Sequence, residues 1–280
     1  MWYLDNEDGS DGSEFWLSSF QKDRSALPLL LIRLVIFLAC VGMLIATIVL
    51  SIITEQIDAR YWPIYMTHWG IITYTLCTFF GCWVSIAAFT GSIDCSSGLP
   101  WYVKAYWFWY NVALPFAFFI TAFYYTFLSA IVHTFAYIDP ILDVVIHGMS
   151  SILMMILLLT ARHPSRFLHF YQPFSISLVY LLFTIIYYLV GGTDPNGNVW
   201  IYPNIDWSKT GPTTRMIIGS TVVFLTLHFM AVLISMGRDW LSNRYIRNET
   251  KMQGIPESRS LKSEASGHKI GAGSVSKKDK

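Results

Sequence analysis

Four polar residues share one face of an apolar segment in the middle of the chain. The segment reads DVVIHGMSSILMMILLLTA and places Asp143, His147, Ser150 and Ser151 at helical spacing. A carboxylate one helical turn from a histidine can orient the imidazole ring, and an oriented histidine can act as a general base. A nearby hydroxyl could then be the nucleophile of a hydrolytic reaction. Asp143 and His147 are therefore candidate catalytic residues, and Ser150 is a weaker candidate.

Two further residues could join this group from neighbouring apolar segments. Thr67 stands at the start of one such run, and His133 stands at the end of another. Thr67 is the candidate nucleophile and His133 a weaker candidate base, because both are predicted near the same membrane face as His147. His147, His133 and Asp143 could alternatively hold a metal ion. No HxxH or HExxH pattern favours that alternative, so we expect no metal and no other cofactor.

The same polar residues also have a simpler interpretation, which we favour. Small and polar side chains commonly join helices inside membranes. Two more stripes of this kind run along other apolar segments, at Thr67, Tyr74, Thr78 and Ser85, and at Thr214, Thr221, His228 and Ser235. Polar stripes could also line the path of a transporter, but no internal repeat or pair of broken helices points to one.

The composition indicates what must position these residues. Of the 280 residues, 54% are hydrophobic and 13% are charged, and the mean hydropathy is +0.46. Soluble domains carry about 25% charged residues, so most of this chain is expected to avoid water. The net charge of +1 gives no indication of a nucleic-acid partner. The expected partners are membrane lipids, with other membrane proteins as further candidates, and no nucleic acid.

Six apolar runs are long enough to cross a bilayer, which takes about 20 residues of helix. They cover residues 29–53, 66–89, 106–127, 141–160, 174–190 and 216–236, and the third is expected to extend toward residue 137. The chain is therefore predicted to be an all-α polytopic bundle of about six transmembrane helices, with a possible kink at Pro115. Residues 1–27 form the predicted N-terminal segment, 28–237 the membrane domain, and 238–280 a basic, largely disordered tail.

The positions of lysine and arginine predict the orientation of this bundle. With six spans both termini share a side, and the flanks on that side are much richer in cations. We therefore place both termini in the cytosol. Arg33 is expected to snorkel to the same face, and His163 and His169 to meet lipid headgroups there. The cytosolic flanks hold Lys22, Arg24, Lys104, Arg162, Arg166, Arg238, Arg244 and Arg247, and the opposite flanks hold only Arg60, Lys209 and Arg215.

Two segments outside the spans carry further signals. Residues 191–215, on the non-cytosolic side, contain Gly-Gly, Asp-Pro and Asn-Gly turn pairs and are predicted to form a structured cap. The chain ends in KKDK, whose first two lysines resemble a dilysine retrieval signal for the endoplasmic reticulum. A basic, solubilising end is an equally good explanation. The predicted location is the plasma membrane or the endoplasmic reticulum.

The run RHPSRFLHFYQPFSISLVYLLFTIIYYLVGGTDPNGNVWIYPNIDW resembles the rolling stone family of multi-pass membrane proteins. WYNVALPFAFFITAFYYTF and YMTHWG resemble it too, and the likeness covers roughly residues 61–236 in matching order. The family is named for a role in myoblast fusion in insects and has no established catalytic chemistry. The resemblance implies action in cell fusion or membrane organisation. This is the leading hypothesis, and it makes an enzymatic activity uncertain and less favoured.

A more remote resemblance is to the androgen-induced membrane hydrolases, which cleave fatty acid esters of hydroxy fatty acids with a threonine and a histidine. The likeness puts Thr67, in YMTH, at the position of their nucleophile. IHGMSS is similar to their NHGMHT motif, with His147 at the first histidine and Ser150 in place of the catalytic second one. The alternative hypothesis is therefore a membrane-embedded lipid ester hydrolase, in which His147 or His133 serves as the base.

Overall fold

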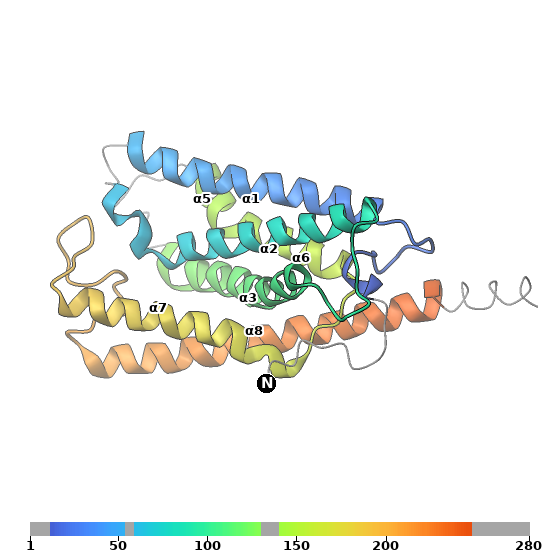
Figure 1. Ribbon diagram of the computed structural model, residues 1–280. Helices are drawn as coiled ribbons and strands as arrows, with labels where there is room; N and C mark the ends of the chain where they lie inside the picture. The colour runs from blue at the N-terminus through green and yellow to red at the C-terminus, as the bar shows by residue number, and fades with distance from the viewer. Residues whose placement is uncertain (1–11, 54–58, 130–139, 248–280) are drawn as a thin grey trace, which may run out of the picture.

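A computed structural model of the chain describes residues 12–53, 59–129 and 140–247. Within these ranges the regular structure is helical and contains no β-strand, which confirms the prediction of an all-α membrane bundle. The helices run side by side along one common direction (Figure 1). They are α1 (Leu27–Ile53), α2 (Met66–Phe89), α3 (Trp101–Phe123), α5 (Pro140–Val144), α6 (Ser150–Thr160), α7 (Tyr171–Leu189) and α8 (Thr210–Ser242).

Five helical stretches are long and apolar enough to cross a membrane. They are Leu27–Ile53, Met66–Phe89, Trp101–Leu128, Phe167–Leu189 and Thr210–Arg247. The predicted run 141–160 is built differently, because α5 and α6 are joined by a π-helical turn, η4 (Val145–Met149). These three pieces follow one another without a break, so the fourth predicted span corresponds to one interrupted helix.

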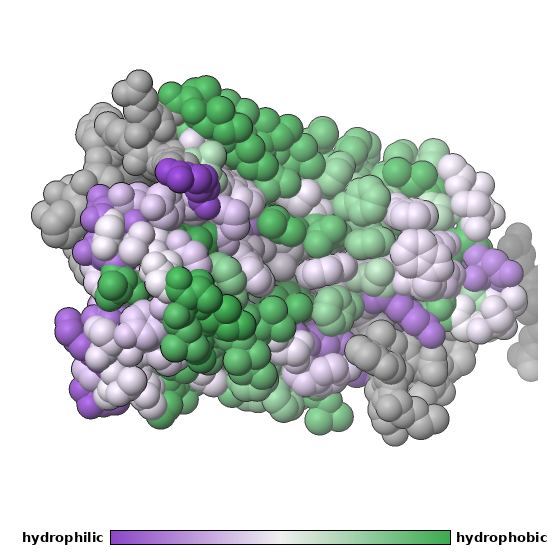
Figure 2. Space-filling model, turned by 60° about the vertical axis from the view of Figure 1, so that its left-hand side comes forward, coloured by the Kyte–Doolittle hydropathy of each residue, from purple (hydrophilic) through white to green (hydrophobic). Residues whose placement is uncertain are grey.

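Helix α3 lies at the centre of the bundle, in contact with α2, α6, α7 and α8. Its side chains and those of α2 make up most of the buried core, whereas α1, α7 and α8 turn large apolar side chains outward. Val35 and Ile52 of α1, for example, are each 67% exposed. Figure 2 shows hydrophobic residues spread along the length of one face, with hydrophilic residues gathered mainly toward the two ends. Such a surface suits a protein surrounded by lipid.

The start of the described chain and the end of α8 lie at the same end of the bundle (Figure 1). We call this the terminal end, and we call the opposite end, which carries residues 190–209, the loop end. The loop is folded tightly: Oδ1 of Asp194 accepts the backbone N–H groups of Asn196 and Asn198 at 2.9 and 2.7 Å. The Tyr202 hydroxyl accepts the Met66 N–H at 2.8 Å and so ties the loop to the start of α2. A structured cap was predicted here, and the loop has that form.

Several local details differ from the sequence prediction. Residues of the predicted N-terminal segment pack into the bundle, where Phe15 and Leu17 are 1% and 2% exposed. Helix α3 continues through Pro115, and its first irregularity is the π-helical turn η3 (Tyr124–Leu128), two turns later. Helix α8 runs well past both ends of the predicted span 216–236.

Candidate functional site

The predicted pair Asp143 and His147 does form a contact, and a tyrosine completes the group. Nδ1 of His147 lies 3.0 Å from Oδ1 of Asp143. The Tyr124 hydroxyl donates a hydrogen bond to the same carboxylate oxygen. The Tyr124 ring also stacks on the His147 ring, with centroids 3.5 Å apart and planes inclined by 1°. The carboxylate thus fixes both aromatic rings, and the histidine has one defined orientation.

Two π-helical turns place this group. Tyr124 is the first residue of η3, and His147 is the central residue of η4. A π turn inserts one residue into the helical ladder, often at a functional site, and so redirects the side chains around it. Both irregular turns therefore meet at the Tyr124–Asp143–His147 group, near the loop end of the bundle.

A pair of hydroxyls holds the two helices together beside this group. The Thr121 hydroxyl lies within hydrogen-bond distance of the His147 carbonyl and 2.7 Å from the Ser151 hydroxyl oxygen. The Ser151 hydroxyl donates to the Ala117 carbonyl at 2.9 Å. These contacts join α3 to η4 and α6, as small polar residues commonly do in membrane bundles.

Thr67 lines an apolar cavity of about 310 Å³ between α2, α3, α7 and α8, which we call the Thr67 cavity. Tyr124 lines the same cavity, but Asp143 and His147 do not. The Thr67 hydroxyl makes no hydrogen bond to any residue that the structure describes, so no proton path joins it directly to the imidazole. The structure brings Asp143 and His147 together, and Thr67 lines a cavity that this pair does not reach.

The other predicted site residues fall elsewhere. Ser150 is 1% exposed, and its hydroxyl has no hydrogen-bond partner among the described residues. His133, the predicted weaker base, lies outside the described ranges. No three His, Cys, Asp or Glu side chains gather at a common point within the described part of the chain.

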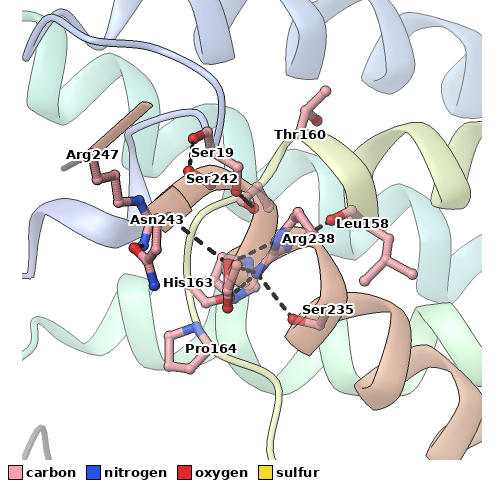
Figure 3. A network of polar contacts seen from close by, with 12 residues as sticks. Ser19, Leu158, Thr160, His163, Pro164, Ser235, Arg238, Ser242, Asn243 and Arg247 are labelled. Atoms are coloured by element: carbon pink, nitrogen blue, oxygen red, sulfur yellow. Dashed lines mark hydrogen bonds and ion pairs between the residues drawn. The ribbon is translucent and has the colours of Figure 1, made fainter. Parts of the chain in front are cut away.

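A second polar network occupies the terminal end (Figure 3). The guanidinium of Arg238, on α8, is buried and donates to the carbonyls of Leu158 and His163 at 2.7 and 3.1 Å. It also donates to the Ser235 hydroxyl at 3.0 Å, and its Nε donates to a carboxylate oxygen of Asp239. One arginine thus connects α8 to the end of α6 and to the turn that follows α6.

Arg33 has a similar role on α1. The prediction that it snorkels to the membrane surface is wrong, because its side chain is fully buried. Its guanidinium donates to the carbonyls of Phe15 and Gly81 at 2.8 and 3.0 Å and to the Ser85 hydroxyl at 2.6 Å. The guanidinium also lies 4.4 Å from the centre of the Tyr106 ring. Partners from three segments replace the water that snorkelling would have provided.

The placement of His163 and His169 at the lipid headgroups is also wrong. His163 is 0% and His169 is 2% exposed. His163 stacks on Phe15 and lies 3.0 Å through Nε2 from the Tyr106 hydroxyl. Burial, together with the positive charges of Arg238 and Arg33, holds the pKa of His163 well below its usual range. The ring is therefore neutral at physiological pH.

Sequence reasoning missed three contributors to these sites, namely Tyr124, Thr121 and the N-terminal segment around Phe15. The signal for Tyr124 was a buried carboxylate that needed a donor, but the chain offers many tyrosines. The predicted stripe on α8 makes contacts of two kinds. Ser235 accepts a hydrogen bond from Arg238 on the same helix, and Nε2 of His228 lies 3.4 Å from the Phe167 carbonyl of another segment.

Comparison with known proteins identifies the relatives of this fold. The family model described as protein rolling stone matches residues 11–248. Protein rolling stone of Drosophila melanogaster is 32% identical over 232 residues, which cover 79% of this chain and 80% of the fly protein. No solved structure matches the chain. Together with the apolar helices of the bundle, these matches show that the chain is a multi-pass membrane protein and belongs to the rolling stone family.

Proposed function

We propose that the chain acts in membrane organisation during cell fusion, as an integral membrane protein that does not catalyse a reaction. The fusion role rests on the resemblance to the rolling stone family. One observation supports a non-catalytic role: the Thr67 hydroxyl has no hydrogen bond to any imidazole that the structure describes, and Tyr124 rather than His147 lines its cavity. Most polar side chains within the described bundle bond to backbone carbonyls or to one another, as helix packing requires.

A content-mixing assay tests the fusion role. Two cell populations carry the halves of a split fluorescent reporter, and the native chain is removed from both. We expect less fusion after removal and recovery after re-expression at the cell surface, which surface biotinylation checks. Equal fusion with and without the chain, at normal cell contact, would exclude the role.

A second candidate function is hydrolysis of lipid esters, with Thr67 as nucleophile and His147 as base. One specific observation favours it: Asp143 orients His147 at 3.0 Å, and the Thr67 cavity beside this pair has the size of a small-molecule site. Catalytic hydrogen bonds are often long in unliganded proteins and tighten on substrate binding. The hydrolase would therefore need Tyr124 to move and open a path between hydroxyl and imidazole.

A fluorophosphonate probe distinguishes the two functions in purified protein. The hydrolase predicts labelling that Thr67→Ala abolishes and Thr75→Ala does not. Thr75 is a matched control because it lies two turns along the same helix and its hydroxyl bonds only the Ile71 carbonyl. Our proposal predicts that the wild-type protein is not labelled, or that Thr67→Ala and Thr75→Ala are labelled equally.

A further inference from the structure

The second cavity at the loop end has a lining unlike that of the Thr67 cavity. Its volume is about 660 Å³, and it lies between α3, η3, the start of α8 and the loop before α8. We call it the outer cavity. Aromatic and aliphatic side chains form much of its wall, among them Phe119, Phe123, Met216 and Val223. Lys209, Arg215 and Asp206 also line it. Sites for small amphiphilic ligands combine such apolar walls with a few placed polar groups.

The cations of the outer cavity are unusual for their position in the chain. Only three lysines or arginines flank the spans on the predicted non-cytosolic side, and Lys209 and Arg215 are two of them. Cations are disfavoured on that side of a membrane protein. Their meeting at one cavity therefore calls for a partner of opposite charge.

The charges of the described neighbours do not provide that partner. Lys209 Nζ lies 3.3 Å from Oδ2 of Asp206, so this pair is neutral as a whole. Hydrogen bonds from Ser208 hold the pKa of Asp206 below its usual range, and its carboxylate stays ionised. Arg215 is exposed and forms no hydrogen bond or ion pair with any described residue. The cavity thus carries one uncompensated positive charge next to an apolar interior.

We propose that the outer cavity binds an anionic phospholipid of the non-cytosolic leaflet, with its phosphate at Arg215 and one acyl chain between α3 and α8. Arginine matches the geometry of phosphate oxygens and forms paired hydrogen bonds with them. The single unpaired charge corresponds to the single negative charge of a phosphodiester headgroup. In the cavity, apolar side chains contact the acyl chain in place of the surrounding lipids. This inference does not depend on a role in fusion or on hydrolysis.

Lipid retention by the full-length protein tests this site. The protein is purified in detergent, incubated with phosphatidylglycerol or phosphatidylcholine of the same acyl chains, and analysed by native mass spectrometry. Phosphatidylglycerol should be retained in preference to phosphatidylcholine. Arg215→Gln should weaken its retention about tenfold, the loss expected for one charge-assisted hydrogen-bonded contact. Arg60→Gln, which removes a cation elsewhere at the same end, should leave it unchanged.

A glycine pair supplies a control for folding. A Cβ added at Gly219, which lines the outer cavity, meets no atom within 4 Å, and the same holds for Gly237 on the same helix. Both substitutions with leucine should preserve or raise stability, because glycine is a poor helix former. Gly219→Leu should fill the cavity and lower phosphatidylglycerol retention, whereas Gly237→Leu should not.

Three results would overturn the proposal. They are equal retention of the two phospholipids, an unchanged affinity in both Arg215→Gln and Gly219→Leu, and displacement of bound phosphatidylglycerol by oleate at equal concentration. The last result would assign the site to a fatty acid carboxylate instead. None of them bears on the content-mixing assay.

Discussion

Arg238 offers the clearest test of what holds the terminal end together. Replacing it with methionine keeps a long, apolar side chain but removes every donor of the guanidinium. The carbonyls of Leu158 and His163 and the Ser235 hydroxyl then lose their contacts to it at 2.7, 3.1 and 3.0 Å. The two carbonyls belong to residues that are themselves buried. Arg238→Met should therefore destabilise the bundle.

The magnitude follows from the cost of unpaired buried groups. A buried acceptor that loses its donor costs about 1–3 kcal/mol, so two carbonyls amount to about 2–6 kcal/mol. The partly exposed Asp239 adds little, because water takes over its hydrogen bond. Methionine removes the desolvation cost of the buried charge, which offsets part of the loss. We expect a net destabilisation of about 2–4 kcal/mol, or a Tm lower by roughly 5–10 °C.

Size-exclusion chromatography of the fluorescently tagged protein after heating in detergent measures this shift. Arg244→Met is the matched control, since Arg244 lies at the same end, is exposed, and has no hydrogen bond or ion pair among the described residues. It should change Tm by less than about 1 °C. Equal melting of the two variants would refute the idea that the Arg238 network stabilises this end.

Three further predictions concern other parts of the bundle. The pKa of His163 is depressed in the folded state, so its contribution to stability is present above the unfolded pKa near 6.5 and falls as the pH drops below it. Between pH 6 and 5 the stability of the wild type should therefore fall by up to about 1.4 kcal/mol per pH unit more than that of His163→Gln. Thermal unfolding at several pH values measures both slopes, and identical slopes would contradict this. Gly70→Ala should destabilise the bundle by about 1–3 kcal/mol, because the added Cβ would lie 2.4 Å from Ile120 Cδ1 and 2.6 Å from the Tyr74 hydroxyl. Gly219→Ala is the control, and equal Tm values for the two variants would refute the packing argument. Tyr124→Phe should cost about 1–2 kcal/mol by removing the donor to buried Asp143. The control is Tyr245→Phe, at an exposed residue just beyond the end of α8, and equal stability of the two variants would show that the bond adds none.

The sequence was sufficient to predict the class of fold and most spans, because about 20 apolar residues in a row have few alternatives to a membrane helix. It also predicted the Asp143–His147 contact, since residues four apart on a helix lie on one face. The interruption of the fourth span was not predictable, because a π turn leaves no clear mark on hydrophobic periodicity.

The errors at the terminal end share one physical cause. Arg33, His163 and His169 were assigned to the membrane surface because polar side chains near span ends usually reach water or headgroups. Here other parts of the chain provide buried partners instead. The segment around Phe15 provides a carbonyl for Arg33 and an aromatic ring for His163, and α3 provides the Tyr106 hydroxyl for His163 and the Asn111 amide for His169. Nothing in the acidic, polar start of the chain indicates that part of it belongs to the core.

The most direct test of the central claim is fusion by a chain whose candidate hydrolase residues are disabled. Cells that lack the native chain receive either wild type or the double variant Thr67→Val, His147→Gln. Both substitutions keep the approximate size of the side chain, and glutamine retains a donor for Asp143. A non-catalytic role predicts equal recovery of content mixing at equal surface expression. Recovery with wild type and none with the double variant would contradict it and favour lipid ester hydrolysis.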